Sequence, residues 1–277
     1  MPETASTPKG LPLPPVVHAK LESAVLRNGR ALIVGDVHGC PAELEDLLAK
    51  CNFKADQDKL ILVGDLVGKG QQSAQVVQMA RCLNAAAVRG NWDEDALKAR
   101  ELEGAGQPVP PQHASFVGTL EPEDWAYLQQ LPFSLTLQRH GLVVTHAGLV
   151  PGIPLQEQAL HNLVDMRHVE QIDATDKSKG WKTVPKFPRD AGIPWGQAYE
   201  GESGHVVYGH HARRRLQKWE YCTGIDTGCV LGDNLTALVL PSVSELEARG
   251  FNPHKGVTRE ALGAELVSVK ARQAYSK

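Results

Sequence analysis

The chain has 277 residues, 42% of them hydrophobic, and a formal net charge of −3. This length suffices for one large α/β domain with its own core, and the slight acidity excludes a protein-wide attraction to nucleic acid, so any binding of polyanions has to be local. Five cysteines without a Cys-x-x-Cys pair favour free thiols in a reducing compartment. Neither a membrane-spanning apolar stretch nor an N-terminal secretory signal is recognisable, so we expect no membrane partner and a cytoplasmic location.

Composition divides the chain into three parts. Residues 1–17 are rich in Pro, Ser and Thr, which favours a flexible leader. We expect a single main domain over residues 18–241. Beyond Pro241 the apolar pattern weakens, and we treat residues 242–277 as an extension in which a helix over 260–274 is considered.

An alternation of strands and helices is predicted for the first part of the domain. Three apolar runs have the pattern of buried strands, at residues 31–35, 60–64 and 85–89. The helices predicted to follow these strands lie at residues 41–51, 72–83 and 93–102. Pro41 suits the first turn of the first helix, and Asp93 suits the N-cap of the third. This order predicts a parallel half-sheet with crossover helices.

The second part of the domain has shorter and less regular elements. A helix, a hairpin-like pair of strands and a further helix are predicted at residues 121–131, at 133–138 with 141–146, and at 155–166. Residues 168–204 are loop-rich and mix basic with aromatic side chains, so we expect either a solvated flap or a nucleotide contact there. The strands expected to complete a second sheet lie at residues 205–209, 221–225 and 235–240.

Six short segments carry metal-binding side chains, most of them directly after an apolar run. They are GDVHG at 35–39, GDLVGKG at 64–70, GNWD at 90–93, HAG at 146–148, GHH at 209–211 and DTG at 226–228. One such segment alone is as consistent with an ordinary turn after a strand as with a metal site. Because ligands in layered α/β proteins gather beyond the strand ends, their joint occurrence predicts one shared site.

The side chains in these segments have the chemistry of a site for two divalent cations. Carboxylate, amide and imidazole donors suit Mn, Fe or Zn better than Ca, which prefers oxygen ligands alone. Two cations about 3.5–4 Å apart can activate a water and neutralise an in-line displacement at phosphorus. Lys69 offers a point charge to a phosphate. We therefore expect two divalent metal ions, Mn first, with Mg, Fe, Zn and Co as alternatives.

These motifs, in this order over roughly residues 30–240, are similar to those of the calcineurin-like metallophosphoesterase superfamily. Within it, Lys69 where protein phosphatases carry Arg, followed by HAGLVPG, YGHHARR and IDTGCVLG, resembles the ApaH-like phosphatases, which are relatives of symmetrical bis(5'-nucleosyl)-tetraphosphatase. The resemblance implies an α/β metallophosphoesterase fold, a β-sandwich of two mixed sheets flanked by helices, with residues 18–241 as its catalytic domain. It also implies a dinuclear site and attack by a metal-bound hydroxide.

The resemblance assigns metal-binding roles to residues of the matching motifs. Asp36 and His38 would bind the first cation, and Asp65 would bridge both cations. The residues that would complete the shell of the second cation are Asn91, His146 and His210.

The same resemblance suggests contacts with the substrate. Lys69, Arg167 and Arg89 are the candidates for binding phosphate. Asp226 would support the site without contacting the substrate. The residues expected to act in catalysis are Asp65, Asn91, Lys69 and Arg167.

One position departs from the family pattern. After Gly90-Asn91 the superfamily usually has a His that protonates the leaving group or binds the phosphate, and here the residue is Trp92. An indole N–H donates hydrogen bonds but protonates nothing at neutral pH. Phosphate and nucleotide leaving groups need such help least, so Trp92 favours phosphoanhydride substrates over phosphoserine esters. Trp92 either binds substrate by stacking on a nucleobase or packs beside the site.

These observations lead to one leading hypothesis and two alternatives. The leading hypothesis is a metal-dependent phosphohydrolase acting on nucleoside polyphosphates such as diadenosine tetraphosphate, with polyphosphate or the capped 5' end of RNA, as in mRNA decapping, left open as substrates. The first alternative is a Ser/Thr protein phosphatase. The second is a weakly active or inactive metal-bound module that binds nucleotides. The oligomeric state is not predictable from these features.

Overall fold

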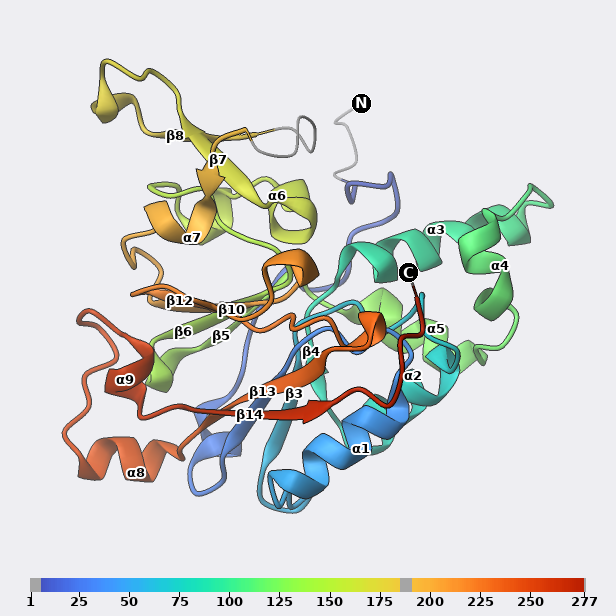
Figure 1. Cartoon of the computed structure of the whole chain (residues 1–277), viewed down its shortest axis with the longest axis horizontal. Coiled ribbons are helices and arrows are strands. Elements are labelled where there is room, and N and C mark those ends of the chain that lie inside the picture. The colour runs from blue at the N-terminus through green and yellow to red at the C-terminus, as the bar shows by residue number, and fades with distance from the viewer. Residues whose placement is uncertain (1–5, 185–190, 277) are drawn as a thin grey trace.

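The computed structural model of the chain describes residues 6–184 and 191–276. Two sheets pack face to face, helices cover the outer side of one of them, and a small third sheet lies on the outer side of the other (Figure 1). This arrangement confirms the expected α/β sandwich of mixed sheets flanked by helices.

The first sheet has five strands, and its parallel part comes from the N-terminal region. β2 (Ala31–Val34) pairs in parallel with β3 (Lys59–Leu62), and β3 pairs in parallel with β4 (Ala86–Ala87). α1 (Pro41–Lys50) and α2 (Ser73–Cys82) form the crossovers between these strands. The expected parallel half-sheet is confirmed, with β4 shorter than predicted.

The antiparallel part of this sheet comes from the C-terminal region. β13 (Asn234–Leu240) pairs with β2, and β14 (Glu265–Lys270) pairs with β13. β13 was expected in the second sheet and belongs to the first. The helix considered over 260–274 is wrong, because α9 (Arg259–Leu262) ends where Gly263 adopts a φ of +62° and an edge strand follows. The stability of that strand depends on its pairing with β13, which the local pattern does not reveal.

The second sheet has six strands. Their order is β1 (His18–Lys20), β5 (Ser134–Leu137), β6 (Leu142–Thr145), β10 (His205–Tyr208), β12 (Cys222–Gly224) and β11 (Gln217–Lys218). The expected hairpin is the antiparallel pair β5 and β6. β6, β10 and β12 run parallel to one another, so their carboxyl ends lie at the same edge of the sheet.

Residues 168–204 contain more regular structure than the loop-rich segment that was expected. β7 (His168–Gln171) pairs antiparallel with β8 (Trp181–Thr183) and with β9 (Ile193–Pro194), and α7 (Trp195–Ala198) follows. This small sheet rises from the outer side of the six-stranded sheet (Figure 1). The prediction of a loop-rich segment is therefore corrected, because part of it forms a three-stranded sheet.

The remaining helices are short apart from α3. They are α3 (Asn91–Gly104), α4 (Pro111–Val117), α5 (Pro122–Gln130), α6 (Leu160–Asp165) and α8 (Val243–Ala248). The helix predicted at 155–166 is split into a 3-10 turn at Leu155–Glu157 and α6. Within the described parts of the chain, no helix is long and apolar enough to cross a membrane.

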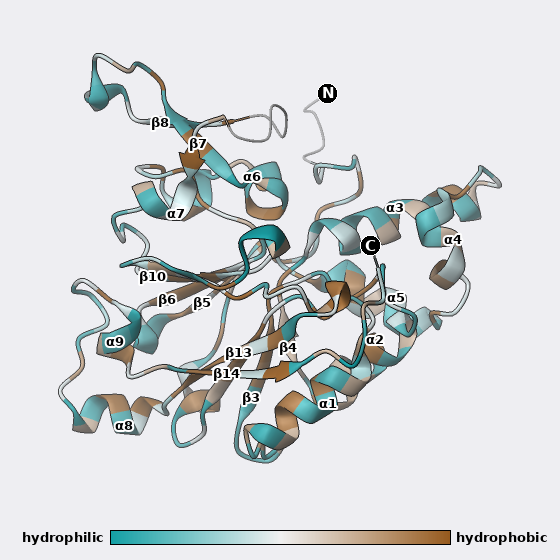
Figure 2. Cartoon of the chain, viewed as in Figure 1, coloured by the Kyte–Doolittle hydropathy of each residue, from teal (hydrophilic) through white to brown (hydrophobic). Residues whose placement is uncertain are grey.

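Two apolar layers hold the sandwich together. Ile33 of β2 packs with Val144 and Val207 of the second sheet, whereas its neighbours Leu32 and Val34 pack with the helices. Successive strand residues point to opposite faces, so a central strand with a layer on each side has to be apolar throughout. Figure 2 shows this pattern, with apolar residues in the strands and on parts of the helices, and polar residues prominent in the outer segments.

The N-terminal segment contacts the main domain where it is described. Leu11 is buried in the layer beneath the helices, and Lys9 forms an ion pair of 2.6 Å with Asp95 of α3. Residues 6–17 are therefore not a free leader, while residues 1–5 lie outside the described part of the chain. The domain limits remain predictions, although β14 lies beyond residue 241 and completes the first sheet.

Candidate metal centre

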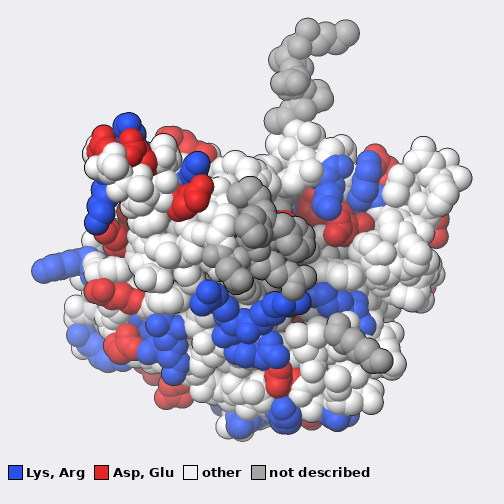
Figure 3. Space-filling model, turned by 45° about the horizontal axis from the view of Figure 1, so that its top comes forward, with Lys and Arg blue, Asp and Glu red and all other residues white. Residues whose placement is uncertain are grey.

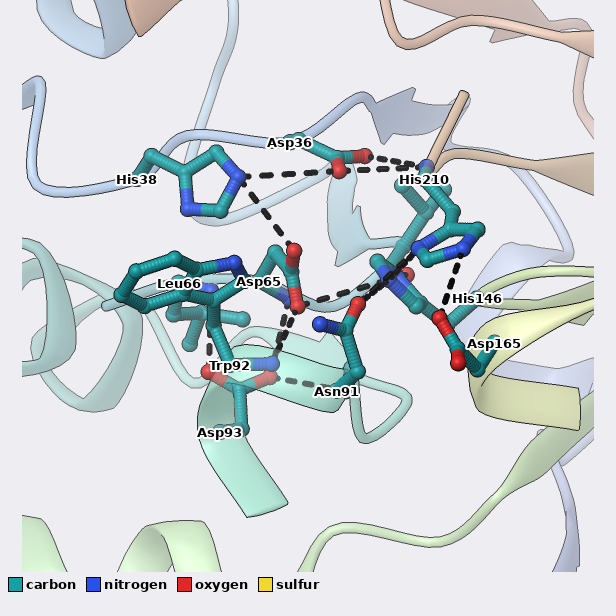
Figure 4. A network of polar contacts seen from close by, with 12 residues as sticks. Asp36, His38, Asp65, Leu66, Asn91, Trp92, Asp93, His146, Asp165 and His210 are labelled. Atoms are coloured by element: carbon teal, nitrogen blue, oxygen red, sulfur yellow. Dashed lines mark hydrogen bonds and ion pairs between the residues drawn. The ribbon is translucent and has the colours of Figure 1, made fainter. Parts of the chain in front are cut away.

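The candidate site lies beyond the carboxyl ends of strands from both sheets. Asp36, Asp65 and Asn91 follow β2, β3 and β4 of the first sheet. His146 and His210 follow β6 and β10 of the second. Figure 4 shows that these side chains point toward one another. Because the strands that carry them are parallel within each sheet, residues far apart in sequence converge at one edge of the sandwich.

Asp65 belongs to two groups of side chains whose donor atoms lie within 4.8 Å of one another. One group is Asp36, His38 and Asp65, and the other is Asp65, His146 and His210. Nε2 of His38 is 3.3 Å from Oδ2 of Asp65, and Nε2 of His146 is 3.3 Å from Oδ1. The two oxygens of Asp65 therefore face different groups, an arrangement in which one carboxylate can bridge two cations.

Backbone carbonyls fix the orientation of two imidazole rings. Nδ1 of His38 is 3.1 Å from the carbonyl oxygen of Val67, and Nδ1 of His146 is 2.9 Å from that of Val63. A ring that donates its Nδ1–H to a carbonyl presents the lone pair of Nε2 on its other side. Both rings thus direct a metal-binding nitrogen toward Asp65.

Asn91 lies within the second group. Its Oδ1 is 2.9 Å from Nδ1 of His210 and 3.1 Å from Nε2 of His146. On the far side of the His210 ring, Nε2 is 3.3 Å from Oδ1 of Asp165. Sequence reasoning misses Asp165, because this residue ends a short helix and no motif marks it. Its carboxylate is placed to orient the ring of His210.

Burial sets the protonation of the centre. It lowers the pKa of His146 to about 4, so this ring is neutral at physiological pH. It raises the pKa of Asp65 to about 7, and the pKa of Asp36 rises through burial and then through repulsion from Asp226 and Asp65. Neutral imidazoles beside mutually repelling carboxylates are suited to binding cations, which remove the repulsion. The donor set therefore fits two divalent metal ions.

The loops that carry the ligands have uncommon backbone geometry. His38 and Asp65 adopt φ angles of +46° and +51°, a left-handed region that is rare for residues other than Gly and is enriched at functional sites. Glycines leave space for the carboxylates. A Cβ at Gly90 would lie 2.2 Å from Oδ1 of Asp65, and a Cβ at Gly209 would lie 2.0 Å from Oδ1 of Asp36.

Asp93 holds the turn that carries Asp65. Its Oδ2 accepts hydrogen bonds from the backbone N–H groups of Asp65 and Gly90, and its Oδ1 accepts one from that of Leu66. The N-cap of α3 is Gly90, and Asp93 is the third residue of the helix, so the predicted N-cap is wrong. The spacing of Gly90 and Asp93 is that of a capping box. The hydrogen bonds that the Asp93 carboxylate accepts from Asp65 and Leu66 connect two loops, so the sequence around Asp93 does not reveal them.

Lys69 and Trp92 lie next to each other at the edge of the first group. Nζ of Lys69 is 2.6 Å from Nε2 of His38 and 4.9 Å from the centre of the Trp92 ring. The backbone N–H of Trp92 donates to Oδ1 of Asp65 at 2.9 Å, and the indole meets the rings of His38 and His113 edge to face. Both predicted residues are therefore brought to the centre.

The two predicted arginines lie in different surroundings. The guanidinium of Arg89 is 1% exposed, pairs with Glu94 at 2.7 Å and donates to the carbonyl of Gln129 at 2.6 Å. These core partners occupy Arg89, so its expected contact with phosphate is not supported. Arg167 lies at the rim, with Nη1 3.4 Å from Oδ1 of Asp165, the carboxylate that meets the ring of His210.

Asp226 contributes charge behind the first group. Its Oδ1 accepts a hydrogen bond of 3.1 Å from the backbone N–H of Gly228. The carboxylate is 5% exposed and, after burial itself, is the largest influence that raises the pKa of Asp36. These contacts agree with the supporting role that was expected for it.

Comparison with known proteins agrees with this geometry. The model of the calcineurin-like phosphoesterase family matches residues 29–233. The symmetrical bis(5'-nucleosyl)-tetraphosphatase of Aromatoleum aromaticum is 28% identical, over 80% of this chain and 96% of that protein. Serine/threonine-protein phosphatase 1 of Salmonella typhimurium is also 28% identical, over 80% of this chain and 96% of that protein. This chain spans only 44–53% of three further tetraphosphatases that it matches.

A solved structure shows the same fold over nearly its whole length. The crystal structure of a protein provisionally assigned as a diadenosine tetraphosphatase superimposes with a TM-score of 0.73 and 32% sequence identity. The match covers 92% of this chain and 98% of the other. The metal-binding motifs, their convergence on Asp65 and the family match agree with one another. The chain therefore belongs to the calcineurin-like phosphoesterase family.

Proposed function

We propose that this chain is a metal-dependent phosphohydrolase that cleaves phosphoanhydride bonds in nucleoside polyphosphates such as diadenosine tetraphosphate. The observation that carries the proposal is the position of Asp65, whose two oxygens face separate groups of metal-binding atoms. The names given to the Aromatoleum relative and to the matching crystal structure point to the same class of substrate.

The two donor groups would hold two divalent cations, for which Mn is our first candidate. Asp36 and His38 would bind one of them and Asp65 would bind both. The residues that would bind the other are Asn91, His146 and His210. Cations bound there supply positive charge for the reacting phosphate and lower the pKa of a water. The same residues exclude bulk water from the centre, since nearly all of them are buried.

Positive side chains would position the polyphosphate. Lys69 contacts the ring of His38 and so can place its ammonium beside a phosphate held at the first group. Arg167 lies at the opposite rim, beside Asp165. Arg213 and Arg214 follow His210 and are exposed. Lys and Arg side chains gather in a band on the face drawn in Figure 3, which favours the approach of an anionic substrate.

Trp92 favours anhydrides among the possible substrates. Its indole replaces the possible general acid, and burial followed by repulsion from Arg167 lowers the pKa of His211, the residue after His210, to about 3. His211 is therefore already deprotonated at neutral pH and is poorly suited to donate a proton. A nucleotide leaves an anhydride as a stabilised anion, whereas a serine alkoxide requires protonation. Inorganic polyphosphate and the RNA cap share this advantage and are further candidates.

A Ser/Thr protein phosphatase is the second candidate, because the Salmonella relative matches over an equally large share of the chain. Two residues stand against it. Lys69 lies where protein phosphatases carry Arg, and Trp92 cannot donate the proton that a serine leaving group requires. A nucleotide-binding module with weak or no turnover is the third. The complete set of metal-binding residues stands against that reading.

Turnover of the purified chain with Mn²⁺ on a panel of substrates tests these candidates. The panel consists of diadenosine tetraphosphate, capped RNA, inorganic polyphosphate, p-nitrophenyl phosphate and a phosphothreonine peptide, with Asp65→Asn as the control. Hydrolysis of the anhydrides alone, abolished in the control, supports the proposal. Turnover of the phosphopeptide instead favours the protein phosphatase, and no turnover with any metal favours the binding module.

The substitution Trp92→His tests the leaving-group argument directly. Restoring an acid should raise the rate on p-nitrophenyl phosphate and phosphopeptide by about 10²-fold or more, the usual size of general acid catalysis, and leave the rate on diadenosine tetraphosphate nearly unchanged. The measurement is kcat on each substrate. Equal changes on all substrates would contradict the argument and indicate that Trp92 only packs against Lys69 and His38.

A further inference from the structure

A second cluster of potential metal ligands lies outside the centre described above. Cys40, Glu43 and Cys229 place two sulfur atoms and a carboxylate oxygen within 4.8 Å of one another. The exposed fractions of these residues are 1%, 0% and 1%. The cluster shares no residue with either donor group around Asp65. Nothing in the proposed phosphohydrolase reaction uses it.

Only one oxygen of the Glu43 carboxylate accepts hydrogen bonds from the described residues. Its Oε1 accepts hydrogen bonds from Oη of Tyr275 at 2.7 Å and from the backbone N–H of Arg272 at 3.0 Å. Its Oε2 is fully buried and has no hydrogen-bond partner among the described residues. Burying a carboxylate oxygen without a partner is unfavourable, and an atom of this kind in a native protein often contacts a water or an ion.

The two thiols lie within 4.8 Å of a ligand oxygen of this carboxylate and come from separate loops. Cys40 is the residue before α1, and Cys229 begins the 3-10 helix Cys229–Leu231 that follows β12. Sγ of Cys40 makes a weak contact of 3.6 Å with the carbonyl oxygen of His38 and also interacts with the thiol of Cys229. Sulfur ligands select thiophilic cations, whereas the centre around Asp65 offers only oxygen and nitrogen. The two sites therefore differ in the metal that they would prefer.

We propose that Cys40, Glu43 and Cys229 form a separate structural site for a thiophilic divalent cation such as Zn²⁺. These residues supply three ligands, and Tyr275 or a water supplies the fourth. Cys40 lies two residues after His38, and Cys229 lies three residues after Asp226. A cation here joins the loop after β2 to the loop after β12 and holds the ligand loops of the catalytic centre in place.

The C-terminal segment covers the cluster and controls access to it. The backbone N–H groups of Tyr275 and Ser276 donate to the carbonyl of Val230 at 2.9 Å and 3.0 Å. Arg272 forms an ion pair of 2.9 Å with Asp46 of α1. We therefore expect the binding of a cation by the sulfurs to require movement of this segment.

Titration of the reduced full-length chain with Co²⁺ tests the proposal. Thiolate ligands give Co²⁺ a charge-transfer absorption in the near ultraviolet that oxygen and nitrogen ligands do not produce. We expect this band to appear in the wild-type chain and to be lost when Zn²⁺ is added. Cys40→Ser and Cys229→Ser should each weaken it by at least half, and the double variant should abolish it. Cys51→Ser is the matched control, because Cys51 is a buried thiol at the other end of α1, outside the cluster, and should retain the band.

The substitution Glu43→Gln keeps the proposal testable if the serine variants do not fold. It preserves both thiols and the shape of the side chain, and we expect at least a tenfold weaker affinity for Co²⁺ judged by the same band, with circular dichroism to confirm folding. A wild-type chain without the sulfur band overturns the proposal, and so does a band that keeps its full intensity in Cys229→Ser. The readout is independent of turnover, so the result stands whichever substrate the catalytic centre takes.

Discussion

The two donor groups of the catalytic centre differ in how the fold builds them. Asp36, His38 and Asp65 all follow strands of the first sheet, within one βαβ unit. The other group joins Asp65 to His146 and His210, which come from the second sheet. The first group can form wherever β2 and β3 pair, whereas the second forms only when the two sheets pack together. A cation held by the second group would therefore link the halves of the sandwich.

Asp65→Asn should have the largest effect, because it removes the charge shared by both groups. We expect kcat/KM on the best substrate of the panel to fall by at least about 10³-fold, since cation charge stabilises the transition state by several kcal/mol. Metal content after gel filtration should fall at both sites. Retention of both metal ions by the folded variant would contradict the bridging role.

His38→Ala and His146→Ala separate the two groups. Each should lose one cation and about 10²-fold or more in activity, as for removal of one electrostatic element of an active site. In His38→Ala the remaining cation still joins the two sheets, so a chelator should lower Tm more than in His146→Ala. The measurements are metal content and Tm with and without chelator. Equal chelator effects would mean that the second cation stabilises the sandwich no more than the first.

Asp93→Asn should have an intermediate effect, because Asp93 orients the turn of Asp65 without facing a cation. Residues that position a metal ligand typically contribute about 10–100-fold to metal affinity or activity. We expect a loss in this range, measured as kcat/KM over a series of Mn²⁺ concentrations. Glu101→Gln, at an exposed position of the same helix, is the matched control and should leave activity unchanged. A loss of equal size in both variants would indicate a general weakening of α3.

Acid should weaken the second sheet, which is an effect on stability rather than on turnover. Burial lowers the pKa of His205 on β10 from 6.5 to about 4, and Nε2 is 2.9 Å from Oγ1 of Thr223. Between these values the unfolded chain binds the proton and the folded chain does not, so stability falls as pH falls from 6.5 toward 4. The loss amounts to at most about 3 kcal/mol.

Thermal unfolding of the metal-free chain from about pH 7 to about pH 5 measures this loss. The decline should be shallower in His205→Gln than in the wild type. A chelator is present throughout, so that competition between protons and cations does not contribute. The metal-binding histidines still titrate in both proteins, so the difference between the wild type and His205→Gln reports His205. Parallel declines would exclude His205 as the source.

The same contrast explains what could be predicted from sequence. β2, β3 and their ligands were predictable, because an apolar run, a glycine and the ligand follow one another directly. The contacts of Arg89 and Asp165 were not, because Gln129 and His210 become their partners only through tertiary packing. β14 was missed for a related reason, since its residues are only partly buried and depend on β13 for pairing.

The left-handed backbone of the ligand loops has an evolutionary consequence. His38, Asp65 and His210 all have positive φ angles, which glycine would adopt with less strain. Replacing one of these residues with glycine removes a ligand and some strain together, so a metal-free variant of this kind can be at least as stable as the native chain. Selection for stability alone would then erode these positions, and only selection for catalysis keeps them as they are.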